Sequence, residues 1–155
     1  MKKILLLIAV ILIASCTTDE KDCCTIIDTG VSIKYLNEEG ENLFEMDGGL
    51  NLADINTYHK IGDEWVKYFE GNLDYPKGLR TVEREYGTYL DVFPSTNIDE
   101  NGYSETKIEF SNSDFDILKT EVVKKNSNEI VTKVWYNDAL KWEGNQTERI
   151  IEIVK

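Results

Sequence analysis

The sequence predicts an all-β fold, a single domain built as an antiparallel β-sandwich. Short segments rich in β-branched and aromatic side chains recur between residues 25 and 155, and such side chains favour strands. Turn-forming Gly, Asn and Asp residues separate these segments about every eight to twelve residues. No stretch has the three-to-four-residue apolar spacing of a long amphipathic helix. Together these observations predict packed sheets without helices.

In the first half of the domain, strands are predicted at residues 31–35, 57–61 and 65–69. Residues 31–35 alternate apolar and polar side chains with a period of two, as a half-buried strand does. Gly62, Asp63 and Glu64 separate the other two strands, which predicts a hairpin. Glycine and proline residues break regular structure, so loops are predicted at residues 47–54 and 70–78.

In the second half, strands are predicted at residues 79–83, 86–93, 106–110, 115–123, 130–136, 140–143 and 149–154. Pro94 ends one of them, because proline lacks the N–H group that a strand ladder requires. Asn137 and Asp138 tolerate positive φ and therefore predict a tight hairpin turn. About nine short strands at this spacing suggest an immunoglobulin-like or transthyretin-like sandwich, with a partly open barrel as the alternative.

Strict alternation along the last hairpin predicts which of its faces is buried. The more apolar face is expected to be the core face, and the opposite face is expected to be more polar, with Tyr136 as its most exposed aromatic residue. The expected core face consists of Val131, Lys133, Trp135, Leu140 and Trp142. The opposite face consists of Thr132, Val134, Tyr136, Ala139 and Lys141.

The chain begins with Met1, Lys2 and Lys3, followed by eleven consecutive apolar residues at positions 4–14. Eleven helical residues span roughly 16 Å, about half of a bilayer core, which is too short for a transmembrane anchor. A basic start followed by such a run is typical of a secretory signal peptide. An uncleaved apolar anchor is the alternative.

The end of this segment resembles the lipobox of bacterial lipoproteins. Ile13 stands at the aliphatic site, Ala14 and Ser15 at the small sites, and Cys16 at the modified site. The resemblance implies cleavage between Ser15 and Cys16 and attachment of acyl chains to Cys16. Two or three chains hold a protein stably on a membrane, whereas one does not. An ordinary signal peptide with a chance cysteine after the cut is the alternative.

The predicted organisation is therefore a signal peptide at residues 1–15, a lipidated polar tether at 16–24 and the sandwich at 25–155. In the tether, Asp19, Glu20, Lys21 and Asp22 resemble the acidic export signal of surface lipoproteins of the Bacteroidota type. That resemblance implies an outer-membrane protein exposed on the cell surface. The alternative is a solvated linker.

A wider similarity covers most of the domain. Residues 31–35, 72–78 and 133–137 resemble the corresponding segments of small Bacteroidota lipoproteins. The resemblance implies one extracytoplasmic β domain without a known reaction, so no functional residue carries over beyond Cys16.

Charge and cysteine usage restrict the partners. The formal net charge is −12, and loss of Lys2 and Lys3 with the signal peptide would make it −14, which argues against nucleic acid. Apart from Cys16, the only cysteines are the adjacent Cys23 and Cys24, which offer no zinc-binding spacing. We expect free thiols there, although a vicinal or intermolecular disulfide is the alternative. No cofactor or metal is expected.

The residues required for common enzymatic chemistries are missing. His59 is the only histidine, and the chain contains no GxSxG elbow, P-loop or GxGxxG sequence. Residues 97–102 resemble half of a calcium loop, but position twelve of that loop would be Ile108 instead of a glutamate. Carboxylates are so plentiful that a glycosidase pair cannot be recognised by sequence alone. We therefore expect no enzyme.

The sequence instead predicts a membrane-anchored envelope lipoprotein with a binding or structural role. Its partner would be a protein or glycan that the sequence does not identify. The alternative function is an outer-surface module that binds or hydrolyses carbohydrate. Tyr75, Tyr103 and Tyr136 are the candidate contact residues, whereas most other aromatic residues are expected to pack in the core.

Overall fold

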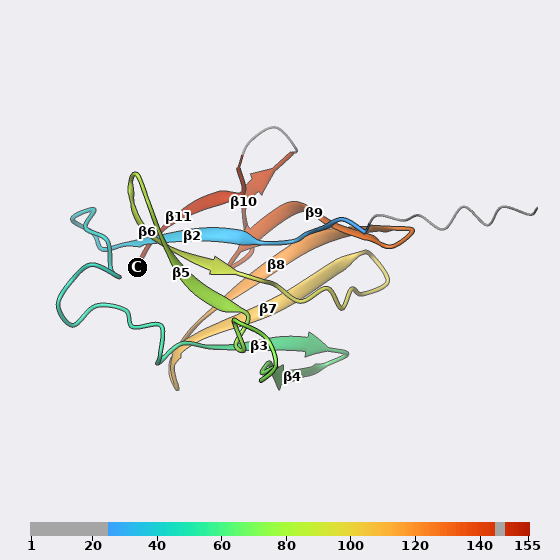
Figure 1. Ribbon diagram of the computed structural model, residues 1–155, viewed down its shortest axis with the longest axis horizontal. Coiled ribbons are helices and arrows are strands. Elements are labelled where there is room, and N and C mark those ends of the chain that lie inside the picture. Colours follow the sequence, from blue (N-terminus) through green and yellow to red (C-terminus); the bar gives the residue numbers. More distant parts are fainter. Residues whose placement is uncertain (1–24, 145–147) are drawn as a thin grey trace, which may run out of the picture.

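The computed structural model describes residues 25–144 and 148–155, which form two β-sheets packed against each other (Figure 1). The described residues contain no helix, so the predicted all-β sandwich is confirmed. Its strands are β1 (Ile27–Asp28), β2 (Val31–Leu36), β3 (Asn56–Ile61), β4 (Glu64–Lys67), β5 (Leu79–Arg84), β6 (Gly87–Val92), β7 (Tyr103–Ser111), β8 (Asp114–Lys125), β9 (Asn128–Tyr136), β10 (Ala139–Glu143) and β11 (Ile150–Val154).

The larger sheet has the order β1-β9-β8-β7-β3-β4, and β10 also pairs with β9. The smaller sheet has the order β11-β2-β6-β5. Most neighbours are antiparallel hairpin partners, as expected. The predicted turn between β9 and β10 is confirmed, because Asn137 has φ 46° and Asp138 has φ 65°. Positive φ at both central residues matches the twist of the flanking strands.

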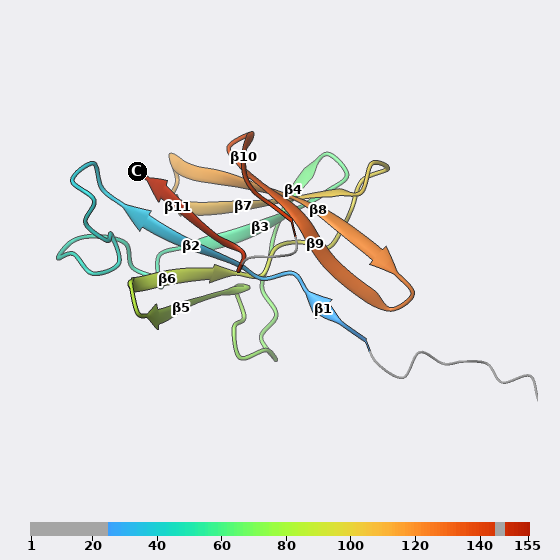
Figure 2. The same ribbon diagram turned by 90° about the horizontal axis from the view of Figure 1, so that it is seen from above.

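The chain crosses between the sheets at Thr29 and Gly30. β1 pairs with β9 in the larger sheet, and β2 pairs with β6 and β11 in the smaller one (Figure 2). The β1–β9 and β2–β11 pairs are parallel, which the sequence did not predict, and they are the two exceptions among the strand pairs of the described residues. Parallel neighbours require a long crossover connection, and most of the domain lies between the members of each pair. Two-residue β1 is too short to show a sequence period.

The side chain of Arg149 holds this crossing in place. Its Nη1 donates to the Gly30 carbonyl at 2.6 Å, and its Nη2 donates to the Val131 carbonyl at 3.2 Å. Both terminal nitrogens also bond the Asp28 carboxylate, at 3.1 and 3.0 Å. One guanidinium therefore joins the start of β11 to the crossing and to β9.

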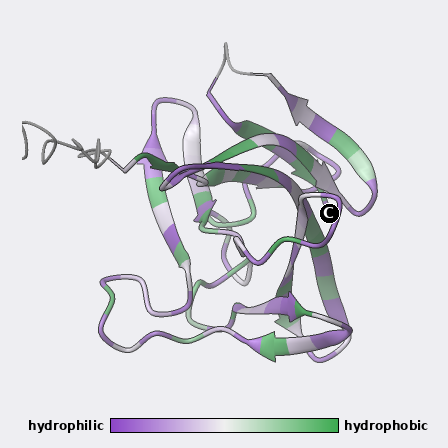
Figure 3. Cartoon of the chain, turned by 90° about the vertical axis from the view of Figure 1, so that its right-hand side faces the viewer, coloured by the Kyte–Doolittle hydropathy of each residue, from purple (hydrophilic) through white to green (hydrophobic). Residues whose placement is uncertain are grey.

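The core lies between the two sheets. Hydrophilic and hydrophobic residues alternate along several strands (Figure 3), as expected for strands with one buried face. Val31, Ile33 and Tyr35 of β2 face Val131, Val134 and Tyr136 of β9 within one apolar cluster. Ile108 of β7 and Leu118 of β8, both fully buried, extend this cluster across the larger sheet.

The predicted faces of the last hairpin are partly wrong, because both of its strands contain a bulge. In the β8–β9 ladder, Val122 pairs with Val131 but Glu121 pairs with Lys133, which leaves one extra residue in β9. A bulge reverses the alternation beyond it. Val134 and Tyr136 are consequently buried, whereas Trp135 is only partly buried.

β10 carries the second bulge. Leu140 pairs with Trp135 as expected, but Trp142 pairs with Val134 instead of Lys133. Trp142 therefore reaches the core as predicted, and Leu140 is exposed.

Tyr136 belongs to a buried polar network that connects the sheets. Its hydroxyl lies 2.9 Å from that of Tyr35 in the smaller sheet and donates to the carboxylate of Asp116 in β8. Asn137 and Lys155 also donate to Asp116, each at 2.7 Å. Burial raises the pKa of Asp116, but the hydrogen bonds from Lys155, Tyr136 and Asn137 outweigh it and lower the pKa below its ordinary value.

The expected signal peptide, the Ser15–Cys16 cleavage site, the acidic tether and the cysteine pair lie outside the described residues. Within the part of the chain that the structure describes, no helix is long and apolar enough to cross a membrane. The lipid anchor therefore stays a prediction.

Replacing Tyr136 by Phe should lower the free energy of unfolding by about 1.5–3 kcal/mol, the usual contribution of a hydrogen bond to a charged group. The change removes the hydroxyl that bridges Tyr35 and the Asp116 carboxylate while keeping the ring. Urea unfolding measures the difference. Tyr58→Phe is the control, because the Tyr58 hydroxyl also bonds a carboxylate, Glu109, but on the outer face of the sheet. Equal losses in the two variants would show that the buried network stabilises the fold no more than a hydrogen bond on the outer face does.

Candidate functional site: an aromatic pocket beside the first strand

A pocket of about 620 Å³ opens beside β1, between the end of β6 and the larger sheet. This is the size range of small-ligand sites. Five parts of the chain line it: β1 and the crossing, β3, the loop at residues 68–78, the segment after β6, and β9. We call it the aromatic pocket, and its main side chains are His59, Tyr68, Leu73, Tyr75, Phe93 and Pro94.

Local hydrogen bonds hold the loop that supplies Tyr68 and Tyr75. Lys77 donates to the carbonyls of Ala53 at 2.7 Å and Ile55 at 2.9 Å, and its own carbonyl accepts the hydroxyl of Thr57. Gly78 has φ 66°, and a Cβ there would lie 3.1 Å from the Tyr68 ring. The sequence thus needs glycine at this position for both the backbone conformation and the space.

The opposite wall is the segment that follows Pro94. Buried hydroxyl groups of the larger sheet bind it: Ser95 N–H donates to Thr106 Oγ1 at 2.8 Å, and Ser104 Oγ donates to the Ser95 carbonyl. Ser104 in turn lies 2.8 Å from Thr120 Oγ1. Paired hydroxyls of this kind allow irregular backbone to be buried, which fixes this wall against β7.

Tyr75 and Phe93 form one aromatic pair of the pocket. Their ring centroids lie 6.0 Å apart at an interplanar angle of 14°, and the residues are 40% and 36% exposed. The guanidinium of Arg80 lies over both rings, 5.1 Å from Tyr75 and 5.7 Å from Phe93. Arg80 does not line the aromatic pocket but a neighbouring polar hollow around Asp91. The two rings are therefore held rigidly while part of their surface stays open.

His59 and Tyr68 form the second pair, stacked at 4.3 Å and 22°. His59 Nε2 is buried and has no hydrogen-bond partner among the described residues. Burial lowers the pKa of His59 to about 4, because a low-dielectric site disfavours the charged ring. The imidazole is consequently neutral at physiological pH.

The polar side chains of the pocket are acids and an amide. Asp74, Asn97 and Glu129 line it, together with Thr29 and Thr96, whereas no lysine or arginine of the described residues does. The hydrogen bond from Lys124, at 2.7 Å, lowers the pKa of Glu129, so this carboxylate is ionised. Lys124 itself lies outside the pocket lining. The pocket thus offers hydrogen-bond acceptors and negative charge.

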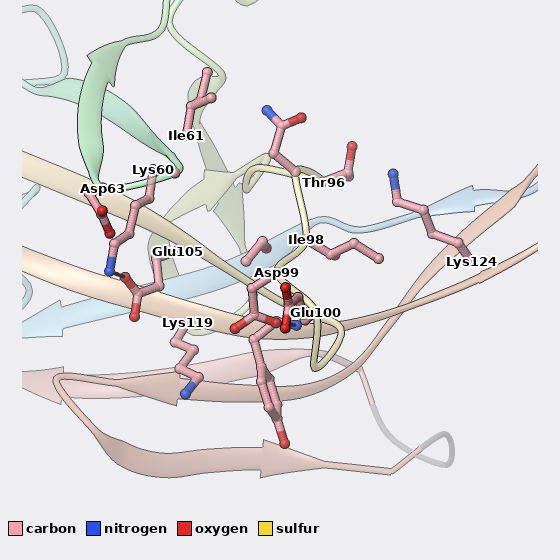
Figure 4. A pocket seen from close by; sticks show the side chains of 14 residues that line it. Lys60, Ile61, Asp63, Thr96, Ile98, Asp99, Glu100, Glu105, Lys119 and Lys124 are labelled. Atoms are coloured by element: carbon pink, nitrogen blue, oxygen red, sulfur yellow. Dashed lines mark hydrogen bonds and ion pairs between the residues drawn. The ribbon is translucent and has the colours of Figure 1, made fainter.

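A second hollow, of about 740 Å³, lies on the other side of residues 96–97 (Figure 4). Two of its carboxylates already have partners: Glu105 pairs with Lys60 at 2.6 Å, and Asp99 accepts N–H groups from Asn101 at 2.8 Å and Tyr103 at 2.9 Å. The backbone hydrogen bond from Tyr103 lowers the pKa of Asp99. A general acid requires the opposite shift, so this hollow does not offer Asp99 as a proton donor.

The calcium-like segment around Asp99 forms a turn in which the carboxylate binds backbone N–H groups. Among the described residues, no group of three or more His, Cys, Asp or Glu side chains could hold a metal ion.

The three tyrosines predicted as contact residues do not meet. Tyr75 lines the aromatic pocket, and Tyr103 lines the second hollow. The ring of Tyr103 packs against Trp135, with 5.5 Å between the ring centroids. Tyr136, only 4% exposed, is part of the inter-sheet network, and its expected exposure is wrong because of the β9 bulge. Sequence analysis missed His59 and Phe93 as pocket residues. Pro94, which was predicted to end the preceding strand, is the one signal next to Phe93, and no sequence signal indicates His59.

The chain was compared with models of protein families, with curated proteins and with solved structures, and no match was found. Function therefore has to be argued from the site itself.

His59 should make the stability of the protein fall as the pH drops from about 6.5 to about 4. In this range the unfolded chain binds a proton at His59 that the folded protein excludes, so acid favours unfolding. Urea unfolding from pH 7 to pH 4 should show a steeper loss for the wild type than for His59→Gln, which cannot titrate. Carboxylates titrate in both proteins, so only the difference between the curves reports on His59. Parallel curves would contradict the burial of a neutral imidazole.

Proposed function

We propose that this protein is a lipid-anchored protein of the cell envelope whose β-sandwich binds a ligand in the aromatic pocket. The observation that carries the binding role is the exposure of two rigidly held rings, Tyr75 and Phe93, in a concave site with acceptor groups. Preformed apolar pockets with a few polar groups are the usual form of small-ligand sites. The lipobox resemblance at residues 13–16 supports the anchor.

The position of the pocket suits a tethered binding module. Ile27 and Thr29 line it, so it lies where the domain meets its tether. The eleven residue-to-residue steps from Cys16 to Ile27 can span at most about 36–40 Å. A lipid on Cys16 would therefore hold the pocket close to the membrane surface. We place the protein at the outer membrane, and the acidic residues Asp19, Glu20 and Asp22 favour its outer face.

Attachment of the protein to the membrane should depend on the sulfur atom of Cys16. Intact-mass analysis of the native protein should show a chain that starts at Cys16 and carries acyl mass, because the lipobox directs both events. Cys16→Ser should abolish the acyl mass and shift the protein from the membrane fraction to the soluble or precursor fraction. The control is Cys23→Ser, which should leave anchoring unchanged. A wild-type protein that still begins at Met1, or lacks acyl mass, would refute the anchor.

Ligand binding should depend on the exposed rings. Immobilised wild-type protein should retain at least one component of an envelope extract that Tyr75→Ala and Phe93→Ala lose, since each change removes open aromatic surface from the pocket. Tyr86→Ala is the matched control, because Tyr86 is 71% exposed and lies on the β5–β6 turn outside the pocket. Identical retention by all four proteins would mean that the pocket is not a binding site.

A further inference from the structure

The shape of the aromatic pocket restricts the ligand. The Tyr75 and Phe93 rings are nearly parallel, and both residues line the pocket and are partly exposed. The second pair, His59 and Tyr68, is also stacked, so two stacked ring pairs line the pocket. Aromatic ring faces suit a ligand with a flat apolar face that can stack on them.

Charge restricts the ligand further. Among the described residues, Asp74 and Glu129 line the pocket without any lysine or arginine, although Lys124 pairs with Glu129 from outside the lining. The histidine of the pocket has a buried nitrogen without a hydrogen-bond partner among these residues. An anionic group placed here would be desolvated beside two carboxylates, which is unfavourable. The negative net charge of the whole chain adds repulsion at longer range. Phosphates, fatty acids and acidic sugars are therefore poor ligands.

The polar groups then indicate what the ligand must donate. Carboxylates accept hydrogen bonds only, whereas the amide of Asn97 and the hydroxyls of Thr29 and Thr96 donate as well as accept. A matching ligand carries many hydroxyl groups around a ring with an apolar C–H face. A pyranose has both features, and the volume of about 620 Å³ holds more than one sugar ring.

From this arrangement we infer that the aromatic pocket binds a neutral oligosaccharide, with one pyranose stacked on Tyr75 and Phe93 and its hydroxyls bonded to Asp74, Asn97 and Glu129. This inference rests on the proposed function, because it names the ligand class of the same site. It assigns the pocket to binding and includes no cleavage of the glycan.

A glycan array probed with the labelled full-length protein in detergent tests the inference. Neutral oligosaccharides should bind, and acidic ones should bind less. Calorimetry with the tightest neutral oligosaccharide should show affinity reduced by at least about tenfold in Tyr75→Ala and Phe93→Leu, as for central aromatic contacts. Tyr75→Phe keeps the ring and should bind nearly as well as the wild type. Tyr86→Ala should be unaffected, and thermal unfolding should show that all variants are folded.

Each other result overturns the inference. Preference for acidic glycans would contradict the charge argument, and binding that survives both ring substitutions would place the glycan elsewhere. Calorimetry with choline chloride provides a cationic probe, and its binding in place of sugars would make the pocket an ammonium site. If no sugar binds while the pocket still retains an envelope component, the carbohydrate inference fails and the proposed binding function stands. If neither occurs, both fail.

Discussion

The structure depends on one constraint, the crossing of the chain between the two sheets at Thr29 and Gly30. β1 pairs with β9 in the larger sheet, and after the two residues of the crossing β2 enters the smaller sheet. Arg149 stabilises this crossing, because its guanidinium donates to the Gly30 and Val131 carbonyls and to the Asp28 carboxylate at the same time. Buried backbone carbonyls need such partners, and the planar, five-donor guanidinium can supply several at once.

The two ends of the sandwich differ in how the space between the sheets is filled. Toward the C terminus, the hydroxyls of Tyr35 and Tyr136 meet the Asp116 carboxylate and close the space between the sheets. Beside the crossing, the sheets are separated by irregular segments, and stacked rings fill the gap only in part. A polar network at one end thus secures the sheets, while the other end stays open as a pocket. This division explains why the candidate site lies next to β1.

Much of the fold could be predicted because strand periodicity and turn residues are local properties. The strands at 31–35 and 57–61 and the Asn137–Asp138 turn were predictable for this reason. Bulges are not local, because they depend on the register with a partner strand. The burial of Tyr136 was therefore missed. The pocket could not be predicted for the same reason, because its residues come from five separate parts of the chain. Only Tyr75 stood out, in a predicted loop. The parallel β1–β9 pair depends on contacts between the two ends of the domain, which no local pattern contains.

The central claim is that the open end of the sandwich is a ligand site. The most direct test is an NMR titration of the ¹⁵N-labelled protein with the neutral oligosaccharide that binds it most tightly. The account predicts chemical-shift changes confined to the amides of the pocket segments, which are residues 27–29, 73–78 and 93–97 together with His59, Tyr68 and Glu129. Changes centred on Tyr103, Lys119 and Trp135 of the outer face, or no changes at saturating sugar, would contradict it.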